Sequence, residues 1–106
     1  MATAWIYLIA AGLTEIVWAS TLKRTEGFTR LGPSLFTAAI MALSFYLLSR
    51  ALKDLPMGTA YAVWTSIGAA GTVLVGIIFA GESASPVRLA CLFLILLGTA
   101  GLKVAG

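Results

Sequence analysis

Four long apolar stretches occupy nearly the whole chain, and they limit its possible folds more than any other feature. They run from about residue 2 to 22, 31 to 49, 56 to 80 and 87 to 104. Each is long enough to cross a bilayer, because a spanning helix needs about 20 mostly apolar residues. Little of the 106-residue chain remains outside them. We therefore predict an all-α integral membrane protein, with one domain of four transmembrane helices over residues 1–106.

The composition excludes several other classes of protein. Charged residues make up 10% of the chain, against about 25% of a typical soluble domain. So little polar surface cannot cover the core of a small soluble domain. This excludes a soluble enzyme, a nucleic-acid-binding domain and a disordered tail. The net charge of +3 arises from seven scattered Lys and Arg residues, so we expect no nucleic-acid partner.

Residue types that carry out chemistry are few. The sequence has no His and a single Cys, Cys91, which lies in an apolar stretch. Within one chain, this excludes a disulfide, a His metal site and a thiolate metal cluster. No cofactor motif and no pair of nucleophile and base is visible, so we expect no cofactor, no metal and no enzyme activity. The first apolar stretch lacks a basic leader and is too long for a cleaved signal peptide.

The charges that flank the apolar stretches are nearly balanced between the two sides of the membrane. Short cytoplasmic loops usually carry an excess of Lys and Arg. The side with the N-terminus, the second loop and the C-terminus has three such residues, Arg50, Lys53 and Lys103. The opposite side has four, Lys23, Arg24, Arg30 and Arg88. Three against four leaves two interpretations open, a fixed orientation and insertion in both orientations.

Glu15 is the only acidic residue inside an apolar stretch, near the middle of the first. A charged side chain at the centre of a spanning helix costs roughly 2.5–3.5 kcal/mol on insertion scales, so it normally faces the bundle interior or a water-filled cavity. We interpret Glu15 as a binding site for protons or for a cation. A protonated Glu that makes one structural hydrogen bond is the alternative.

Polar aromatic and hydroxyl side chains recur at helical spacing in the same stretches. Trp18 lies three residues after Glu15 and shares its helix face. Its indole N–H can donate to a carboxylate, and its ring can cover a cation. Tyr61 and Trp64 form a similar pair in the third stretch, and Ser44 is a hydroxyl in the second. The alternatives are an interfacial anchor for Trp18, packing for the later pair and a backbone bond for Ser44.

A dimer would complete what one chain lacks. One chain supplies one buried carboxyl and four short helices, which is little to enclose a path for a substrate. Two Glu15 side chains close together would titrate as a coupled pair, and a cation would compete with protons for them. This competition suffices for proton-coupled antiport. Small residues that let helices approach closely include Ser66 and Gly68 in the third stretch and Gly98 in a possible dimer seam.

Several motifs along the chain occur together in one known family. They are Glu15, the Glu-Gly-Phe-Thr-Arg loop at 26–30, the Leu-Pro-x-Gly-Thr-Ala-Tyr-Ala-x-Trp run at 55–64 and the Gly-x-Lys ending near Lys103. By these motifs, essentially the whole chain resembles the small multidrug resistance family. The resemblance implies an antiparallel homodimer whose two copies insert in opposite directions. It also implies a multi-pass protein of the inner (plasma) membrane of a bacterium.

Within this family the chain is more similar to the guanidinium exporter subtype than to the broad drug exporters. Residues 15–18 carry the subtype's Glu-x-x-Trp pattern, and Met41 stands where drug exporters often have an aromatic residue. Ser66 replaces a usual family glycine, two residues before Gly68. The resemblance implies that Glu15 binds substrate and protons, and it places Gly98 in the dimerisation stretch. The hydrogen-bonding and stacking partners that it implies are Trp18, Ser44, Tyr61 and Trp64.

We therefore expect a proton-coupled antiporter that exports guanidinium and singly substituted guanidinyl cations. Guanidinium is planar and always charged, and its paired N–H donors match a carboxylate. The alternatives are an exporter of quaternary ammonium and other cationic drugs within the same family and, outside it, a non-transporting membrane subunit that uses Glu15 for packing. The expected partners are the cation, protons, a second copy of the chain and the lipid bilayer.

Overall fold

Four helices long and apolar enough to cross a membrane make up most of the structure, which confirms the all-α prediction. The structure is a computed structural model and describes residues 2–105. The helices are α1 (Ala2–Leu22), α2 (Leu31–Ala51), α3 (Met57–Phe79) and α4 (Pro86–Ala105). A short 3-10 helix, η1 (Lys23–Thr25), follows α1. The α2 helix runs two residues past its expected end because its backbone hydrogen bonding continues, with Leu52 N donating to Leu48 O at 3.0 Å.

The helix ends follow from the backbone preferences of proline and glycine. Pro86 is the first residue of α4, and Pro56 stands immediately before α3. Proline suits the start of a helix because its missing N–H would have no partner there. Gly27 and Gly81, with φ of 73° and 69°, lie in the left-handed region that favours glycine. These residues set the two turns that follow α1 and α3.

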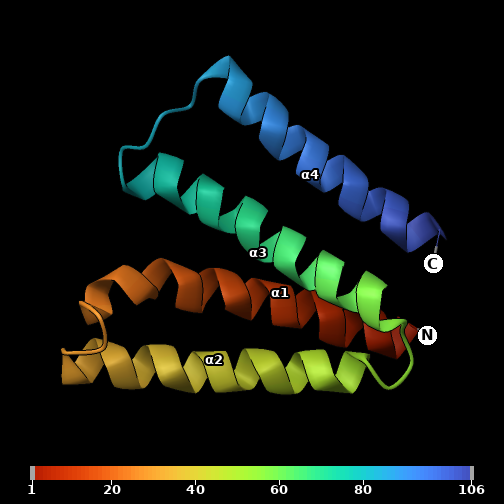
Figure 1. Cartoon of the computed structure of the whole chain (residues 1–106), viewed down its shortest axis with the longest axis horizontal. Helices are drawn as coiled ribbons and strands as arrows, with labels where there is room; N and C mark the ends of the chain where they lie inside the picture. The colour runs from red at the N-terminus through yellow and green to blue at the C-terminus, as the bar shows by residue number, and fades with distance from the viewer. Residues whose placement is uncertain (1, 106) are drawn as a thin grey trace.

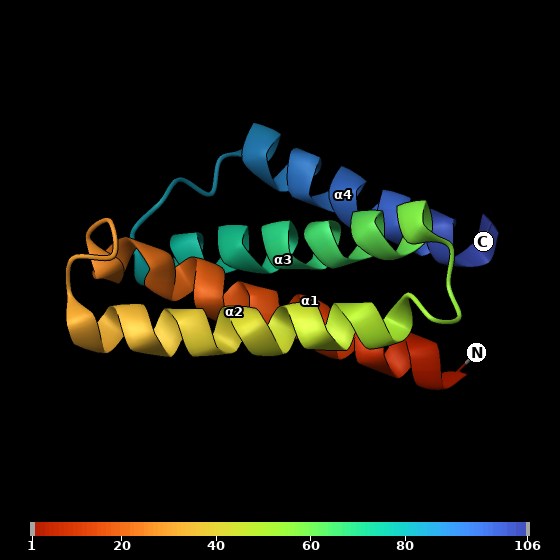
Figure 2. The ribbon, with the colours of Figure 1, turned by 60° about the horizontal axis from the view of Figure 1, so that its bottom comes forward.

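The α1 helix lies at the centre of the protomer, between α2 on one side and α3 on the other (Figure 1). Within residues 2–105, α4 packs mainly against α3, and only its C-terminal end reaches α1. The protomer is thin, with extents of 40 × 35 × 17 Å, and Figure 2 shows α4 on the far side of α3 from α2. One face of α3 therefore packs against α1, and α4 contributes little to the packing of the other three helices.

Small residues let α1 and α3 pack closely along their length. Both helices run in the same direction, from the N-terminal end of the molecule towards η1 (Figure 1). A Cβ atom built on Gly12 would lie 2.7 Å from the Ile67 side chain, and one built on Gly71 would overlap Ile16. Each glycine thus accepts an isoleucine from the other helix. This fixes the register in which the middle of α1 faces α3.

The packed core is formed mainly by α1 and α3. It is a continuous cluster of small and apolar side chains near the N-terminal halves of these helices, closed by residues at the end of α2. Its members are Ala4, Leu8, Ala11, Ala51, Leu55, Ala60, Val63 and Trp64. In contrast, Leu92 is the only buried residue of α4. The core therefore holds α1, α2 and α3 together near one end of the helices.

Candidate functional site

Glu15 lies half-buried in the middle of α1, with its carboxyl against α3. The carboxyl occupies the place that a side chain on Gly68 would take, because a Cβ atom built there would overlap it. The Glu15 Oε1 atom is buried and has no hydrogen-bond partner among residues 2–105. Buried polar atoms in proteins are nearly always paired with protein or water. This atom therefore remains available to bind a proton, water or a ligand.

The absence of a side chain at Gly68 predicts the effect of Gly68→Ala. Alanine normally stabilises a helix over glycine by roughly 0.5–1 kcal/mol. At this position the added methyl group meets the Glu15 carboxyl, and overpacking costs typically about 1–3 kcal/mol. We expect Gly68→Ala to lower the free energy of unfolding, measured by denaturation of the purified protein in detergent. The control is Gly58→Ala, where nothing lies within 4 Å of the new Cβ atom. Equal stability of the two variants would show that the Glu15 carboxyl does not depend on Gly68.

A row of four aromatic rings crosses the protomer beside Glu15. Phe45 of α2 stands between Trp18 and Trp64, with ring centroids 6.3 Å and 5.7 Å away in edge-on arrangements. Tyr61 extends the row, with its ring centroid 5.7 Å from that of Trp64. Tyr61 is 58% exposed, whereas Trp64 is buried. The structure thus brings the predicted aromatic residues of α1 and α3 together through a ring from α2.

Ser44 connects all three of these helices. Its hydroxyl is fully buried and donates to the carbonyl oxygen of Ala11 at 2.9 Å. It also accepts a hydrogen bond from Trp64 Nε1 at 3.1 Å. The hydroxyl therefore bonds across helices instead of to its own backbone. Within the described chain, Trp64 is held by Ser44 and not by Glu15, which the sequence had suggested as an acceptor.

Trp18 and Glu15 do not pair with each other in the protomer. The Trp18 ring packs towards Phe45 on α2, whereas the Glu15 carboxyl lies against Gly68 on α3. The Trp18 Nε1 atom is buried, and residues 2–105 provide no acceptor for it. An unpaired donor and an unpaired carboxyl oxygen therefore lie one helical turn apart. A planar cation beside the carboxyl would have an acceptor at its edge and aromatic rings nearby.

Phe45 is the member of the site that the sequence did not indicate. A phenylalanine inside an apolar stretch has no distinguishing feature, because such residues usually face lipid or the core. The available signal was its position directly after Ser44, which was not enough to separate it from its neighbours. Its place between two Trp rings follows from the packing of α2 on α1.

The two other residues named for helix packing have different surroundings. Ser66 is half-buried, and its hydroxyl donates to the Ala62 carbonyl of its own helix at 2.6 Å. The hydroxyl hydrogen of Ser66 is thus engaged in a hydrogen bond within α3. A Cβ atom built on Gly98 of α4 would meet nothing within 4 Å in the described residues. Gly98 thus leaves an open surface on the helix that packs least within the protomer.

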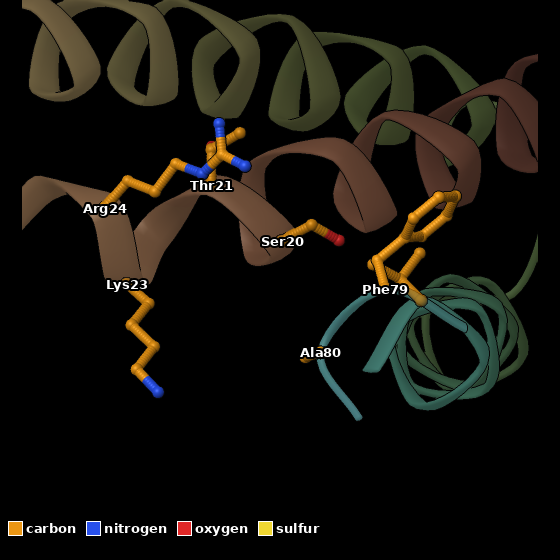
Figure 3. Close-up of a pocket in the computed structure, with 7 residues that line it drawn as sticks. Ser20, Thr21, Lys23, Arg24, Phe79 and Ala80 are labelled. Carbon is orange, nitrogen blue, oxygen red and sulfur yellow. The ribbon is translucent and has the colours of Figure 1, made fainter. Parts of the chain in front are cut away.

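A cavity lies away from Glu15, between the ends of α1 and α3. Its volume is about 470 Å³. Figure 3 shows the Arg24 side chain directed towards α2, whereas that of Lys23 extends to the opposite side of α1. The two cations therefore do not converge on one ligand. The residues that line the cavity are Ser20, Thr21, Lys23, Arg24, Val75, Phe79 and Ala80.

Basic side chains at the other end of the molecule lie against aromatic rings. The Arg50 guanidinium is 4.9 Å from the Tyr7 ring centroid, and its Nη1 donates to the Tyr46 hydroxyl at 2.9 Å. The Lys103 ammonium is 5.2 Å from the Trp5 ring centroid. Such cation–π contacts are typical where aromatic belts meet the membrane surface. Both ends of the helices thus carry positive charge.

No group of three metal-binding side chains occurs in residues 2–105.

Comparison with known proteins gives consistent similarities over almost the whole chain. A model of the Small Multidrug Resistance protein family matches residues 3–95. A protein named Guanidinium exporter from Escherichia coli (strain K12) is 57% identical over 102 residues, which cover 96% of this chain and 97% of the relative. Proteins of the same name from Yersinia pestis and Citrobacter freundii are also 57% identical over 102 residues. These alignments cover 96% of this chain and 98% and 97% of the two relatives.

Proposed function

This chain belongs to the small multidrug resistance family, a multi-pass transporter family of the bacterial inner membrane, and from this we propose that it exports guanidinium cations. The relatives at 57% identity that bear the name Guanidinium exporter support this substrate. The structural observation that carries the proposal is the buried, unpaired Oε1 of Glu15, one helical turn from the aromatic row that begins at Trp18.

The chemistry of guanidinium suits these residues. The cation presents parallel N–H donors that match the two oxygens of a carboxylate, and its planar faces stack on aromatic rings. Glu15 supplies the carboxylate in the proposed complex, and the Trp18 ring covers a face of the cation. Ser44 keeps Trp64 in place through the indole N–H at 3.1 Å. Tyr61 is the exposed end of the row, where a substituent on the cation extends.

Exchange for protons follows in this proposal from competition for one carboxyl. Glu15 binds either guanidinium or a proton, because the cation needs the ionised form. Two copies of the chain place two Glu15 carboxyls in one site, and the pair then titrates together. The proposed antiporter therefore needs no separate coupling device. Each turnover releases protons on one side of the membrane and a cation on the other.

An antiparallel homodimer is the proposed assembly. One protomer offers a single membrane-embedded carboxyl, and its α4 packs mainly against α3 among the described helices. The open surface at Gly98 suits close approach of a second α4. The nearly equal numbers of Lys and Arg on the two sides, three and four, suit two copies of opposite orientation.

The proposed recognition predicts a clear order of substrates. Guanidinium and a monosubstituted guanidinyl ion keep a free edge with two parallel donors, whereas a disubstituted ion blocked on both edges and tetraethylammonium do not. Leaving buried acceptors unpaired costs roughly 1–3 kcal/mol each, so we expect at least about tenfold weaker transport of the last two. Transport currents of the purified protein in liposomes measure this order. Equal currents for tetraethylammonium and guanidinium would replace this proposal with a broad cationic drug exporter.

A further inference from the structure

The seam between α1 and α3 joins Glu15 to the membrane surface in two helical turns. The two helices run in parallel, and Glu15 faces Gly68. One turn further on, about 5–6 Å along the axis, Ala19 and Thr72 line one cavity. The next turn brings Lys23 to the same cavity, near Gly76. The seam therefore leads from the buried carboxyl to the end of both helices.

Thr72 is one of two hydroxyl residues in the described helices whose buried oxygen has no hydrogen-bond partner, and the other is Ser34 of α2. Serine and threonine inside a helix usually donate to the carbonyl three or four residues earlier. Four side chains in this structure donate to the carbonyl four residues earlier, at 2.6–3.1 Å: Thr14, Ser20, Ser66 and Thr99. In contrast, the Thr72 Oγ1 atom is buried and makes no hydrogen bond within residues 2–105. Its hydroxyl therefore lacks a partner within the described residues.

The cavity beside Thr72 is large enough for water, and its wall has both polar and apolar parts. Its volume is about 180 Å³, which gives room for several water molecules at about 30 Å³ each. A site of this kind holds water when polar groups surround it. Residues that bear hydroxyl, ammonium and carboxylate groups are among those that line it. The lining residues are Ala19, Ser20, Lys23, Thr72, Val75, Gly76, Ala80 and Glu82.

Charged groups stand at the outer end of the seam. The Glu82 carboxyl lies on Gly76, where a Cβ atom would come within 2.5 Å of Oε1. Glu82 Oε1 also accepts a hydrogen bond from Arg88 Nη2 at 2.7 Å. The Glu82 carboxylate and the Lys23 ammonium thus both border the cavity next to the membrane surface. Protons and water meet a polar opening there.

The inner end of the seam is much narrower. The Glu15 carboxyl fills the place of a side chain on Gly68, and Ile16 does the same at Gly71. This packing leaves no passage for a planar cation, and Glu15 is not among the residues that line the cavity. The aromatic row lies instead towards α2. Protons move along water and hydroxyl groups without needing such a passage.

We propose that the α1–α3 seam is a hydrated path that carries protons between Glu15 and the membrane surface, separate from the face on which the cation binds. A proton taken up at the outer end moves by successive transfers, in which each oxygen accepts one proton and passes another on. The last transfer protonates Glu15 Oε1, and release follows the reverse order. Thr72 is a positioning residue that orders the water in this path. The inference rests on the proposed exchange of guanidinium for protons.

The test compares Thr72→Val with Thr72→Ser. Valine keeps the shape of threonine and removes the hydroxyl, whereas serine keeps the hydroxyl. Stopped-flow mixing with guanidinium, with a pH-indicator dye, measures proton release from Glu15. Exchange of labelled guanidinium between two equal pools needs no net proton movement and reports substrate binding and conformational change alone. We expect Thr72→Val to slow proton release by about tenfold, less than the hundredfold or more that a direct proton donor supplies.

The remaining outcomes separate this path from a structural role. Under the proposal, Thr72→Val leaves labelled guanidinium exchange unchanged, and Thr72→Ser behaves as the unmodified protein in both measurements. If Thr72→Val slows both processes equally, or neither, the hydrated path is wrong. If the unmodified protein carries no guanidinium, the proposed function fails instead. Proton release induced by tetraethylammonium then tests the path on its own, with the same two variants.

Discussion

Glu15→Gln is expected to abolish proton-driven guanidinium export while the protein still inserts, folds and dimerises. Glutamine has nearly the same size, so it fits beside Gly68 as the carboxyl does. It cannot ionise, and therefore neither binds a cation by charge nor exchanges a proton. We expect the transport current in liposomes to fall to that of liposomes without protein. Thermal unfolding in detergent and size-exclusion chromatography check that the variant is folded and dimeric.

A matched substitution separates the role of this carboxyl from a general effect of lost charge. Glu26→Gln removes an exposed carboxylate from the first loop, where it forms an ion pair with Arg30 at 3.5 Å. Exposed pairs of this kind contribute about 0–1 kcal/mol to stability, so we expect Glu26→Gln to keep the full current. Undiminished proton-driven export by Glu15→Gln would remove Glu15 from the mechanism. Equal loss of the current in both variants would indicate a general effect of removing a negative charge.

The sequence predicted the helices well because membrane insertion depends on properties that a single stretch carries. Length and hydropathy decide whether a segment spans, and proline and polar residues mark where it ends. The α1 helix accordingly has the predicted bounds, from residue 2 to 22. Glu15 was equally visible, because an acidic residue in an apolar stretch is rare and costly. These inferences needed no knowledge of how the helices pack.

The contacts within the site depend on the packing and were less predictable. Spacing placed Trp18 on the face of Glu15, yet the Trp18 ring packs against Phe45 of α2. Ser44 was expected to bond within its own helix or to a ligand, and it instead joins Ala11 to Trp64. Each of these contacts depends on which helix lies beside which. Helical periodicity fixes the face of a residue but not the neighbour that this face meets.

Two buried polar atoms of the site lack a hydrogen-bond partner within one chain, and this supports the dimer proposal. Glu15 Oε1 and Trp18 Nε1 are both buried, yet neither has a hydrogen-bond partner among residues 2–105. Unpaired buried groups cost about 1–3 kcal/mol each, and proteins keep them mainly where a ligand, water or another chain completes the bonding. In the proposed dimer, the second copy brings its own Glu15 towards the same space. The site is then formed by both chains.

Biasing the orientation of the chain is expected to abolish transport by one variant and to restore it in a mixture of two. Leu52→Lys with Asp54→Lys and Met57→Lys raises the number of Lys and Arg on the side of the second loop from three to six, against four opposite. Thr29→Lys with Ala84→Lys raises the opposite side from four to six, against three. All five positions are exposed. The positive-inside preference then gives each variant one orientation.

A single orientation leaves the proposed antiparallel dimer without its second half. We therefore expect each variant alone to export no guanidinium, and the two expressed together to regain export, because the pair supplies both orientations. A reporter at the C-terminus gives the orientation in cells, and efflux of labelled guanidinium from the same cells gives the activity. The control, Leu52→Gln with Asp54→Asn, changes the same loop without adding a cation and should remain active. The proposed assembly is wrong if the unmodified chain shows its C-terminus on one side only, or if either biased variant is active alone.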